Sequence, residues 1–326
     1  MPLIRRRGLW VLPSLALPAL ALPGPALAQS WPSRPIRLLV GFAPGGTTDI
    51  MARLAAERIA PALGQPVVVE NLPGATGNIA AAAAARAEPD GHTLLLGSPG
   101  PLALNRWLFK NMPFDSRTAF TPIGLIGVVP NVVTVRPDLA ATTLAELETL
   151  LKRGNLRTGS PGVGTTGHLT NALFQAAIGA QAIHAGYRGS VPMLTDLMAG
   201  HIDYAIDQLA PPLPLIRDGK LRAIAVSSAQ RSPLLPNVAT MDEQGRPGLS
   251  VAAWFSLVAP AGTPQPVIQR INAALNAALA LPEVQRQLAL QAATPGGGTP
   301  AELAALITRE EAAAERAVRL AGIQPE

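Results

Sequence analysis

The stretch GFAPGGTTDI, residues 41–50, lies at the junction between a predicted strand and a predicted helix. The apolar run IRLLV at 36–40 precedes it and is typical of a strand buried in a parallel sheet, and a helical pattern follows over 48–62. Glycines at such a junction either let the backbone turn sharply or let another group come close to it. Because the first N–H groups of a helix have no partners within the helix, a negatively charged group can approach here.

Two further junctions share this arrangement. NLPGATGN at 71–78 follows the strand-like run at 67–69, and TGSPGVGTTGH at 158–168 begins in a predicted strand at 156–160. Each of them opens a predicted helix. Three helix starts at the carboxyl edges of parallel strands predict an anion site made from backbone amides, without lysine or arginine. Taken singly, each junction is also explained by glycine turns and by first-turn or cap residues such as Asp49.

Strand and helix patterns alternate along the chain in two series. Residues 35–96 read as strand, helix, strand, helix, strand, and a second series of this kind begins at 131. Amphipathic helices over 264–320 follow it. We therefore expect an α/β fold with two doubly wound sheets, joined by strands that cross between two units near 129–135 and 249–258. The first unit is expected to comprise residues 29–130 and 251–326, and the second unit residues 131–250.

The first 28 residues match a secretory signal peptide. Arg5, Arg6 and Arg7 are followed by an apolar stretch over 9–22 and by the small-residue cleavage site Ala26-Leu27-Ala28. An uncleaved anchor is the alternative, which the prolines within the apolar stretch disfavour. The arginine run fits either general or twin-arginine export. The sequence thus predicts an exported, periplasmic protein.

Charge and composition exclude several function classes. Removal of residues 1–28 lowers the number of Lys and Arg residues from 26 to 23, against 21 Asp and Glu, so the formal charge falls from +5 to +2. With no basic block and few aromatic residues, we expect no nucleic-acid binding. No stretch after residue 28 has the apolar length of a membrane span. The absence of cysteine excludes disulfides, a cysteine nucleophile and cysteine metal ligands, so stability depends on burial.

Nucleotide-binding and metal-binding motifs do not account for the glycine-rich loops. The loop at 41–49 lacks the Gly-Lys-Ser/Thr ending of a P-loop. GVGTTG at 162–167 matches the dinucleotide fingerprint G-x-G-x-x-G, but no acidic residue lies near 187, where a ribose contact is expected. The histidines lack the spacing of a metal site, and we expect neither a metal nor a cofactor. They are His92, His168, His184 and His201.

An exported α/β hydrolase is the enzymatic alternative. Ser160 has Gly162 after it but Thr158 before it, so the nucleophile elbow Gly-x-Ser-x-Gly is incomplete. A triad of Ser160 with His184 and Asp207 can nonetheless be drawn. Neither of these two partners is specific to a triad, since His184 either points into a cleft or packs, and Asp207 either contacts ligand or caps the next segment.

The loop GYRG at 186–189 contains one of two tyrosines in the chain. Tyr187 either offers its ring and hydroxyl to a ligand or anchors the loop. Arg188 pairs either with a carboxylate or with solvent.

The motifs occur in a characteristic order over nearly the whole chain after residue 28. They are WPSRPIRLLVGFAPGGTTD (31–49), VVVENLPGATGN (67–78), PDGHTLLLG (89–97), SPGVGTTGHL (160–169), HAGYRG (184–189), DLMAGHIDY (196–204) and AGIQPE (321–326). This series resembles the substrate-binding proteins of tripartite tricarboxylate transporters, also called Bug-type periplasmic receptors.

The resemblance implies a two-lobed, type II periplasmic-binding-protein fold of the Venus-flytrap kind, with crossing hinge strands. It implies a non-catalytic monomer that binds a small di- or tricarboxylate, or an acidic amino acid, in the interlobe cleft. Loop backbone and ordered water hold the ligand, which is delivered to integral-membrane transporter subunits. A ligand-sensing module without transport is a further alternative. The expected ligand-binding residues are Ala43, Pro44, Gly45, Gly46, Thr47, Thr48, Pro73, Gly74, Ala75, Thr76, Ser160, Gly162, Gly164, Thr165, His184, Tyr187 and Asp207.

The chain departs from the family pattern at two places. Gly186 replaces the usual proline before the tyrosine, which is expected to alter the cleft. Ala313 and Ala314 lie where a tryptophan is common in the last helix, which is expected to affect packing alone.

Overall fold

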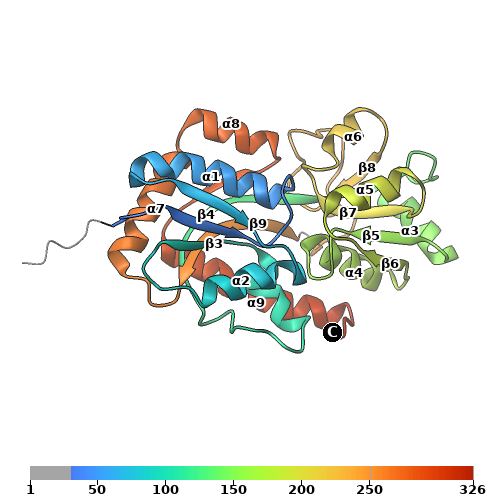
Figure 1. The fold of residues 1–326 in the computed structure, drawn as a ribbon. Coiled ribbons are helices and arrows are strands. Elements are labelled where there is room, and N and C mark those ends of the chain that lie inside the picture. The colour runs from blue at the N-terminus through green and yellow to red at the C-terminus, as the bar shows by residue number, and fades with distance from the viewer. Residues whose placement is uncertain (1–30, 250, 326) are drawn as a thin grey trace, which may run out of the picture. The chain divides into compact units, whose positions relative to one another are not determined.

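The computed structural model describes residues 31–249 and 251–325. The predicted signal peptide at 1–28 lies outside these residues, as does the last residue of the motif at 321–326. Residues from Pro32 onward form one unit, which is described here by itself (Figure 1). Within the described residues, no helix combines the length and apolar character needed to cross a membrane.

Ten strands of the described chain form one mixed sheet (Figure 1). The strands β2, β1, β3, β9, β4, β7, β5 and β6 follow one another across it, and β8 and β10 also pair with β4. Their bounds are β1 Ile36–Val40, β2 Val67–Asn71, β3 Thr93–Gly97, β4 Phe120–Val135, β5 Arg157–Ser160, β6 Ile183–Gly186, β7 Tyr204–Gln208, β8 Arg222–Val226, β9 Ala252–Pro260 and β10 Thr294–Gly297.

Strand β4 joins two groups of parallel strands into this one sheet. Residues 120–130 of β4 pair with β9, which in turn pairs with β3 of the parallel group β1–β3. Residues 131–135 pair with β7 and β8, and β7 belongs to the parallel group β5–β7. The structure therefore has one large mixed sheet where the sequence predicts two separate sheets. Strand β9 pairs with β3 and with the first part of β4.

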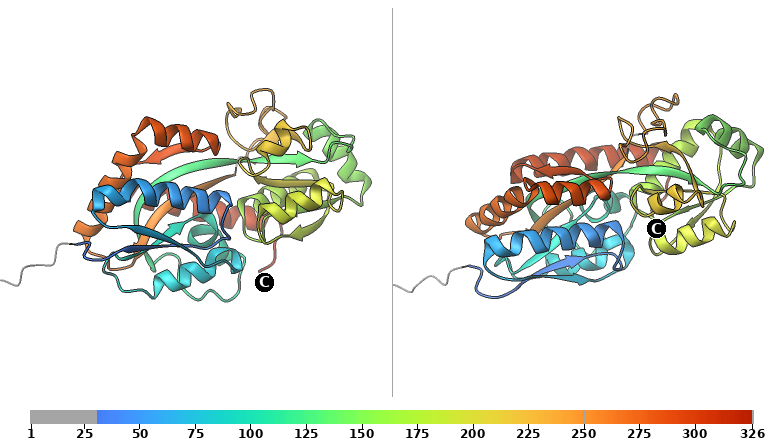
Figure 2. Two further views of the ribbon diagram at one scale, coloured as in Figure 1. Left: turned by 45° about the horizontal axis from the view of Figure 1, so that its top comes forward. Right: turned by 90° about the horizontal axis from the view of Figure 1, so that it is seen from above.

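The helical segments cover both faces of the sheet. Helix α1 contacts β1 and β2 from one side and α2 contacts β3 from the other, as Figure 1 shows. Helix α1 packs against α7, and α7 against α8 (Figure 2). The α-helices are α1 Thr47–Leu63, α2 Asn78–Ala85, α3 Leu144–Arg153, α4 Thr166–Ile178, α5 Ser190–Met198, α6 Leu213–Arg217, α7 Gln265–Leu279, α8 Pro282–Leu290 and α9 Pro300–Leu320. Shorter turns are the 3₁₀ segments η1 Ala75–Gly77 and η3 Asn105–Trp107 and the π-helical turn η2 Gly100–Leu104.

Burial of apolar side chains stabilises both parts of the sheet, as expected for a chain without cysteine. In the group around β1–β3, Leu39, Leu95 and Trp254 belong to one buried cluster. In the group around β5–β7, Phe174 and Ile206 belong to another. Each such side chain contributes roughly 1.5–3 kcal/mol when it leaves water.

Close backbone contact brings the start of α4 against β7. A Cβ added to Gly167, in the first turn of α4, would lie 2.2 Å from the carbonyl oxygen of Ile206 in β7. Only glycine permits this approach. The N-terminus of α4 is therefore held beside the carboxyl end of β7, where the candidate site lies.

Candidate ligand-binding site

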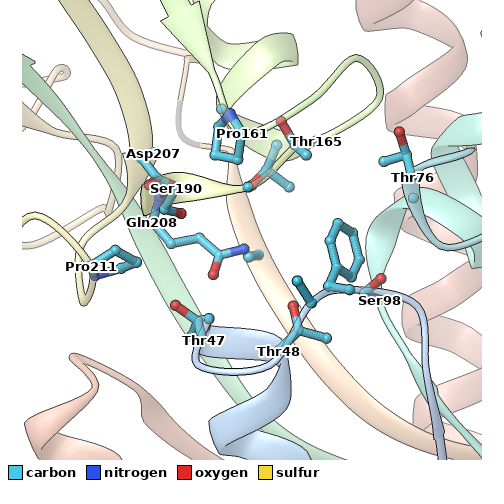
Figure 3. Close-up of a pocket in the computed structure, with 18 of the residues that line it drawn as sticks. Thr47, Thr48, Thr76, Ser98, Pro161, Thr165, Ser190, Asp207, Gln208 and Pro211 are labelled. Carbon is cyan, nitrogen blue, oxygen red and sulfur yellow. Dashed lines mark hydrogen bonds between the residues drawn. The ribbon is translucent and has the colours of Figure 1, made fainter. Parts of the chain in front are cut away.

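Three helix starts meet at a cavity of about 200 Å³ (Figure 3). They are the starts of α1, α4 and α5, each of which directly follows a β-strand and a glycine-containing loop. The helix-start residues that line the cavity are Gly46, Thr47, Thr48, Thr165, Thr166, Gly167, Gly189, Ser190 and Val191. Two of the three junctions that the sequence analysis singled out therefore place their helix starts here, and the third contributes Thr76 while the helix that it opens, α2, begins away from the lining. The start of α5 takes the place of the expected third helix start.

Two of these helix starts have no side-chain cap. The N-cap residues Gly46 of α1 and Gly189 of α5 make no side-chain hydrogen bond. In α4, by contrast, the Thr165 hydroxyl accepts a hydrogen bond from the His168 N–H at 3.3 Å. The Thr47 hydroxyl oxygen is buried without a hydrogen-bond partner among the described residues. Because each helix start carries a partial positive charge, the cavity favours an anion.

Gly45 and Gly46, the two residues before α1, have different roles. Gly45 has φ 86°, a left-handed conformation that favours glycine, and its N–H donates to Asp49 Oδ2 at 3.0 Å. Gly46 is extended, with φ −81° and ψ 169°, and a Cβ there would meet only the Ala43 oxygen at 3.9 Å. Gly45 therefore makes the turn, whereas Gly46 leaves open space at the cavity wall.

Asp49 fixes this turn and does not line the cavity. It is buried, and although burial opposes the change, hydrogen bonds from Arg53, Gly45 and Asn71 lower the pKa of its carboxyl. Asn71 Nδ2 also donates to the Phe42 carbonyl oxygen at 2.9 Å. The carboxylate thus ties the start of α1 to the end of β2.

Asp207 lies at the carboxyl end of β7 and lines the cavity. Its side chain is 1% exposed, and burial raises the pKa of its carboxyl to about 7. The Ser190 hydroxyl beside it and the Gln208 N–H, 2.7 Å from Asp207 Oδ1, act against that rise (Figure 3). The cavity thus contains a carboxyl group whose burial favours the neutral, protonated form.

A second cavity, of about 600 Å³, adjoins the first. Six residues line both cavities, namely Phe42, Ala43, Thr76, Pro161, Arg188 and Gly189. Of these six, Arg188 carries a charge. The Thr76 hydroxyl donates to the Val163 carbonyl oxygen and so joins two loops that line this second cavity.

The structure brings fifteen of the seventeen expected residues to these cavities. Ala43, Pro44, Gly45, Gly46, Thr47, Thr48, Thr76, Gly164, Thr165 and Asp207 line the first, and Pro73, Gly74, Ala75, Thr76, Gly162 and Tyr187 line the second together with Ala43. Ser160 and His184 lie outside both linings.

The buried Ser160 pairs with the half-buried His184 next to the loop at 160–165. Ser160 is fully buried, and its Oγ lies 2.8 Å from His184 Nε2 and donates to the Gly162 oxygen at 3.2 Å. The His184 ring packs on His168 with centroids 4.7 Å apart. Among the described residues, no hydrogen bond joins Asp207 to either histidine. A fully buried hydroxyl without a triad does not support the hydrolase alternative.

Tyr187 has both of the roles considered for it. Its hydroxyl donates to Asp196 Oδ2 at 2.7 Å, which anchors the loop, and burial raises its pKa to about 12. The residue also lines the second cavity.

Several cavity residues were absent from the sequence-based expectation. Ser98, Pro99 and Gly100 follow β3 and repeat the strand-to-glycine pattern, so the same rule could have found them. Phe255 lies within the apolar strand β9 and carries no such signal. The rest are Phe42, Pro161, Thr166, Gly167, Arg188, Gly189, Ser190, Val191, Pro192, Gln208, Pro211 and Ala253.

The two departures from the family pattern lie at cavities. Gly186 lines the second cavity, where an added Cβ would lie 3.2 Å from Val163 Cγ2. Ala313 and Ala314 line a third cavity, of about 260 Å³, beside α9. No group of three or more histidine, aspartate or glutamate side chains within 31–249 and 251–325 is placed to hold a metal ion.

Comparison with known proteins gives consistent results. Residues 51–322 match the model of the tripartite tricarboxylate transporter family receptor. Rpa4515 from R. palustris, solved with adipate, is 38% identical with a TM-score of 0.87, over 91% of this chain and 100% of that one. The periplasmic binding protein BugD is 34% identical with a TM-score of 0.84, over 91% of this chain and 100% of that one. MatC from Rhodopseudomonas palustris, with bound malate, is 33% identical with a TM-score of 0.83, over 88% and 100%.

These likenesses identify the fold as the α/β fold of periplasmic binding proteins. The predicted resemblance is confirmed by the family match and by BugD. The chain belongs to the family of tripartite tricarboxylate transporter receptors, which are binding proteins and not enzymes.

Proposed function

We propose that this protein is an exported periplasmic receptor that holds a small carboxylate where α1, α4 and α5 begin and delivers it to membrane transporter subunits. The ligand class comprises di- and tricarboxylates and acidic amino acids. The observation that carries the proposal is the convergence of three helix starts, two of them without side-chain caps, on one cavity. Oriented N–H groups supply an anion with hydrogen bonds and a favourable field without a buried cation.

The volume of the cavity and the family to which the protein belongs support this ligand class. A cavity of about 200 Å³ suits a small organic acid. Relatives at 38% and 33% identity were solved with adipate and with malate. The loop residues expected from the sequence supply backbone donors, directly or through ordered water. Ser160 and His184 stabilise the loop at 160–165, because the Ser160 hydroxyl bonds to both the Gly162 oxygen and the His184 ring.

The receptor is proposed to close two lobes on its ligand. One lobe comprises residues 29–130 and 251–326, and the other residues 131–250. Strand β4 supports this division because its two parts pair with different groups of strands. The second crossing is proposed near residues 249–258, a range that contains the first part of β9. The hydrogen bond from Thr76 to Val163 links the lobes in a closed form.

A titration with a panel of carboxylates tests the ligand class. We expect succinate, glutarate, adipate or citrate to raise the melting temperature and to change the fluorescence of Trp254, which is buried in β9. The diamide of the same acid is the matched control and should produce neither change, because it lacks the negative charge. No response to any acid in a broad panel would contradict the proposal.

A transport assay tests the partner. We expect deletion of the receptor to abolish uptake of the acid that it binds, and expression of the receptor to restore uptake. Undiminished uptake in the deleted strain, together with an altered cellular response to that acid, would support the ligand-sensing alternative.

A further inference from the structure

A buried carboxyl group inside an anion-binding cavity requires a physical explanation. Asp207 is 1% exposed and shares the lining of the 200 Å³ cavity with the starts of α1, α4 and α5. A second carboxylate bound in this enclosed space would repel an ionised Asp207 strongly, because little water separates the charges. One of the two groups must therefore be neutral, or the ligand must carry a positive charge.

We propose that Asp207 binds the ligand in its protonated form and donates a hydrogen bond to a ligand carboxylate, so that binding takes up a proton. This inference rests on the proposed function. It makes Asp207 a specificity-determining residue, because a neutral donor favours fully anionic acids and offers no counter-charge to the ammonium group of an amino acid.

The contacts around Asp207 are compatible with a protonated carboxyl group. Its Oδ1 accepts the Gln208 N–H at 2.7 Å, which fixes the carboxyl plane at the end of β7. Burial raises the pKa of the group to about 7, against the influence of the Ser190 hydroxyl and the Gln208 N–H. A ligand carboxylate nearby raises it further, since a like charge disfavours ionisation. Proton uptake then accompanies binding at neutral pH.

Charged neighbours on the surrounding elements are engaged elsewhere or lie at the surface. Arg188, before α5, lines the cavity but is exposed. Asp49 on α1 bonds to Arg53 and Asn71, and Asp196 on α5 bonds to Tyr187 and His201. His168 on α4 accepts from the Gly164 N–H, and His184 on β6 bonds to Ser160. The facing residues of β4, Asn131 and Val132, carry no charge.

The competing arrangement is an ionised Asp207 that pairs with an ammonium group. The field of the three helix starts opposes it, because their partial positive charges face the same cavity. An ammonium group also needs several acceptors, whereas helix starts present donors. The helix starts therefore favour a fully anionic ligand, and the burial of Asp207 together with the charge of that ligand favours a neutral Asp207.

Calorimetry of the wild-type protein tests the proposal directly. Succinate, glutarate, adipate and citrate are titrated at pH 6.5, 7.5 and 8.5 in buffers of different ionisation enthalpy, which yields the number of protons taken up. We expect uptake that approaches one proton at pH 8.5, and affinity that falls by up to about tenfold per pH unit above pH 7. Binding with no proton uptake and no pH dependence overturns the role of Asp207 and leaves the proposed function intact.

The Asp207→Asn variant separates this role from a structural one. Its amide keeps an acceptor for the Gln208 N–H and donates permanently, so we expect proton uptake to vanish and the affinity to become independent of pH. Thermal unfolding checks that the variant folds. If it does not fold, the number of protons taken up by the wild-type protein still tests the proposal. Preferred binding of aspartate or glutamate, lost by more than tenfold in Asp207→Asn, overturns the proposal in favour of ammonium pairing. No binding of any acid at any pH overturns the proposed function as well.

Discussion

The Thr76 hydroxyl donates a hydrogen bond to the Val163 carbonyl oxygen, and so joins two loops that lie 87 residues apart in the sequence. The backbone at Thr76 is left-handed, with φ 50° and ψ 44°, and that at Ala75 has φ 45°. Such conformations cost about 1–3 kcal/mol each and persist only where the surroundings hold them. Asn105 Nδ2 contributes by donating to the Thr76 oxygen at 3.2 Å. Strained backbone therefore lies where the loops of the two cavities meet.

Replacement of Thr76 by valine tests the contribution of this bond. Thr76→Val keeps the branched side chain, and with it the backbone strain, but removes the donor. We expect ligand affinity to fall by roughly 1 kcal/mol, or about fivefold, because a typical net hydrogen bond is lost. Thr76→Ser retains the hydroxyl and should recover most of the affinity in the same titration. Equal losses in both variants would show that the bond itself is unimportant.

Gly46 tests the space at the cavity wall. A methyl group at Gly46 meets no atom closer than 3.9 Å, so Gly46→Ala should fold with a loss of about 1 kcal/mol or less in the free energy of unfolding. Ligand affinity should fall about tenfold or more, since one extra methyl in a binding pocket costs about 1–3 kcal/mol.

The matched control is Gly64→Ala at the other end of α1. Gly64 has φ 79° and open space around it, so its substitution should lower stability by about 1–2 kcal/mol and leave ligand binding unchanged. Full affinity in Gly46→Ala would contradict the placement of the ligand against the start of α1.

Gly167 tests the contact that places α4 beside β7. In Gly167→Ala the new methyl group would lie 2.2 Å from the Ile206 oxygen, and backbone cannot move aside cheaply. We expect a loss of about 1–3 kcal/mol in chemical denaturation. Gly179→Ala, at the left-handed C-cap of the same helix with open space around it, should cost about 1–2 kcal/mol from the backbone conformation alone. Equal losses in the two variants would contradict the close approach.

The half-buried histidines His168 and His184 predict a dependence of stability on pH. Burial and the neighbouring His184 lower the pKa of His168 to about 4, and burial lowers that of His184. The unfolded chain, with histidine near its usual pKa of 6.5, therefore binds protons before the folded protein does. The contribution of His168 to the free energy of unfolding is fully present above pH 6.5. It is lost as the pH falls from 6.5 toward 4, by an amount on the order of 3 kcal/mol.

Denaturation at pH 7.5, 6.5, 5.5 and 4.5 checks this dependence. The His168→Gln variant should show a flatter decline than the wild type over that range. His201→Gln is the control, because the His201 side chain is 70% exposed, and it should follow the wild-type curve. A wild-type slope in His168→Gln would contradict the assignment.

The sequence predicts those parts of the molecule whose local chemistry decides their conformation. The three glycine-rich junctions open helices as expected. Fifteen of the seventeen expected site residues line the two cavities because glycine junctions at strand ends lie at one edge of the sheet.

Tertiary pairing decides the parts that the sequence does not predict. Residues 120–130 of β4 contain Pro122, Gly124 and Gly127, which disfavour a strand, and their register shifts twice along β9. Strand β10 has the sequence TPGG and exists through its pairing with β4. The left-handed Thr76 likewise depends on partners distant in the sequence.

A crystal structure of the protein with a bound dicarboxylate from the panel tests the central claim most directly. We expect a ligand carboxylate in the 200 Å³ cavity, bonded directly or through one water to N–H groups in the first turns of α1, α4 and α5. A carboxylate held by the Arg188 guanidinium or outside this cavity, with those N–H groups directed at protein, would contradict the account.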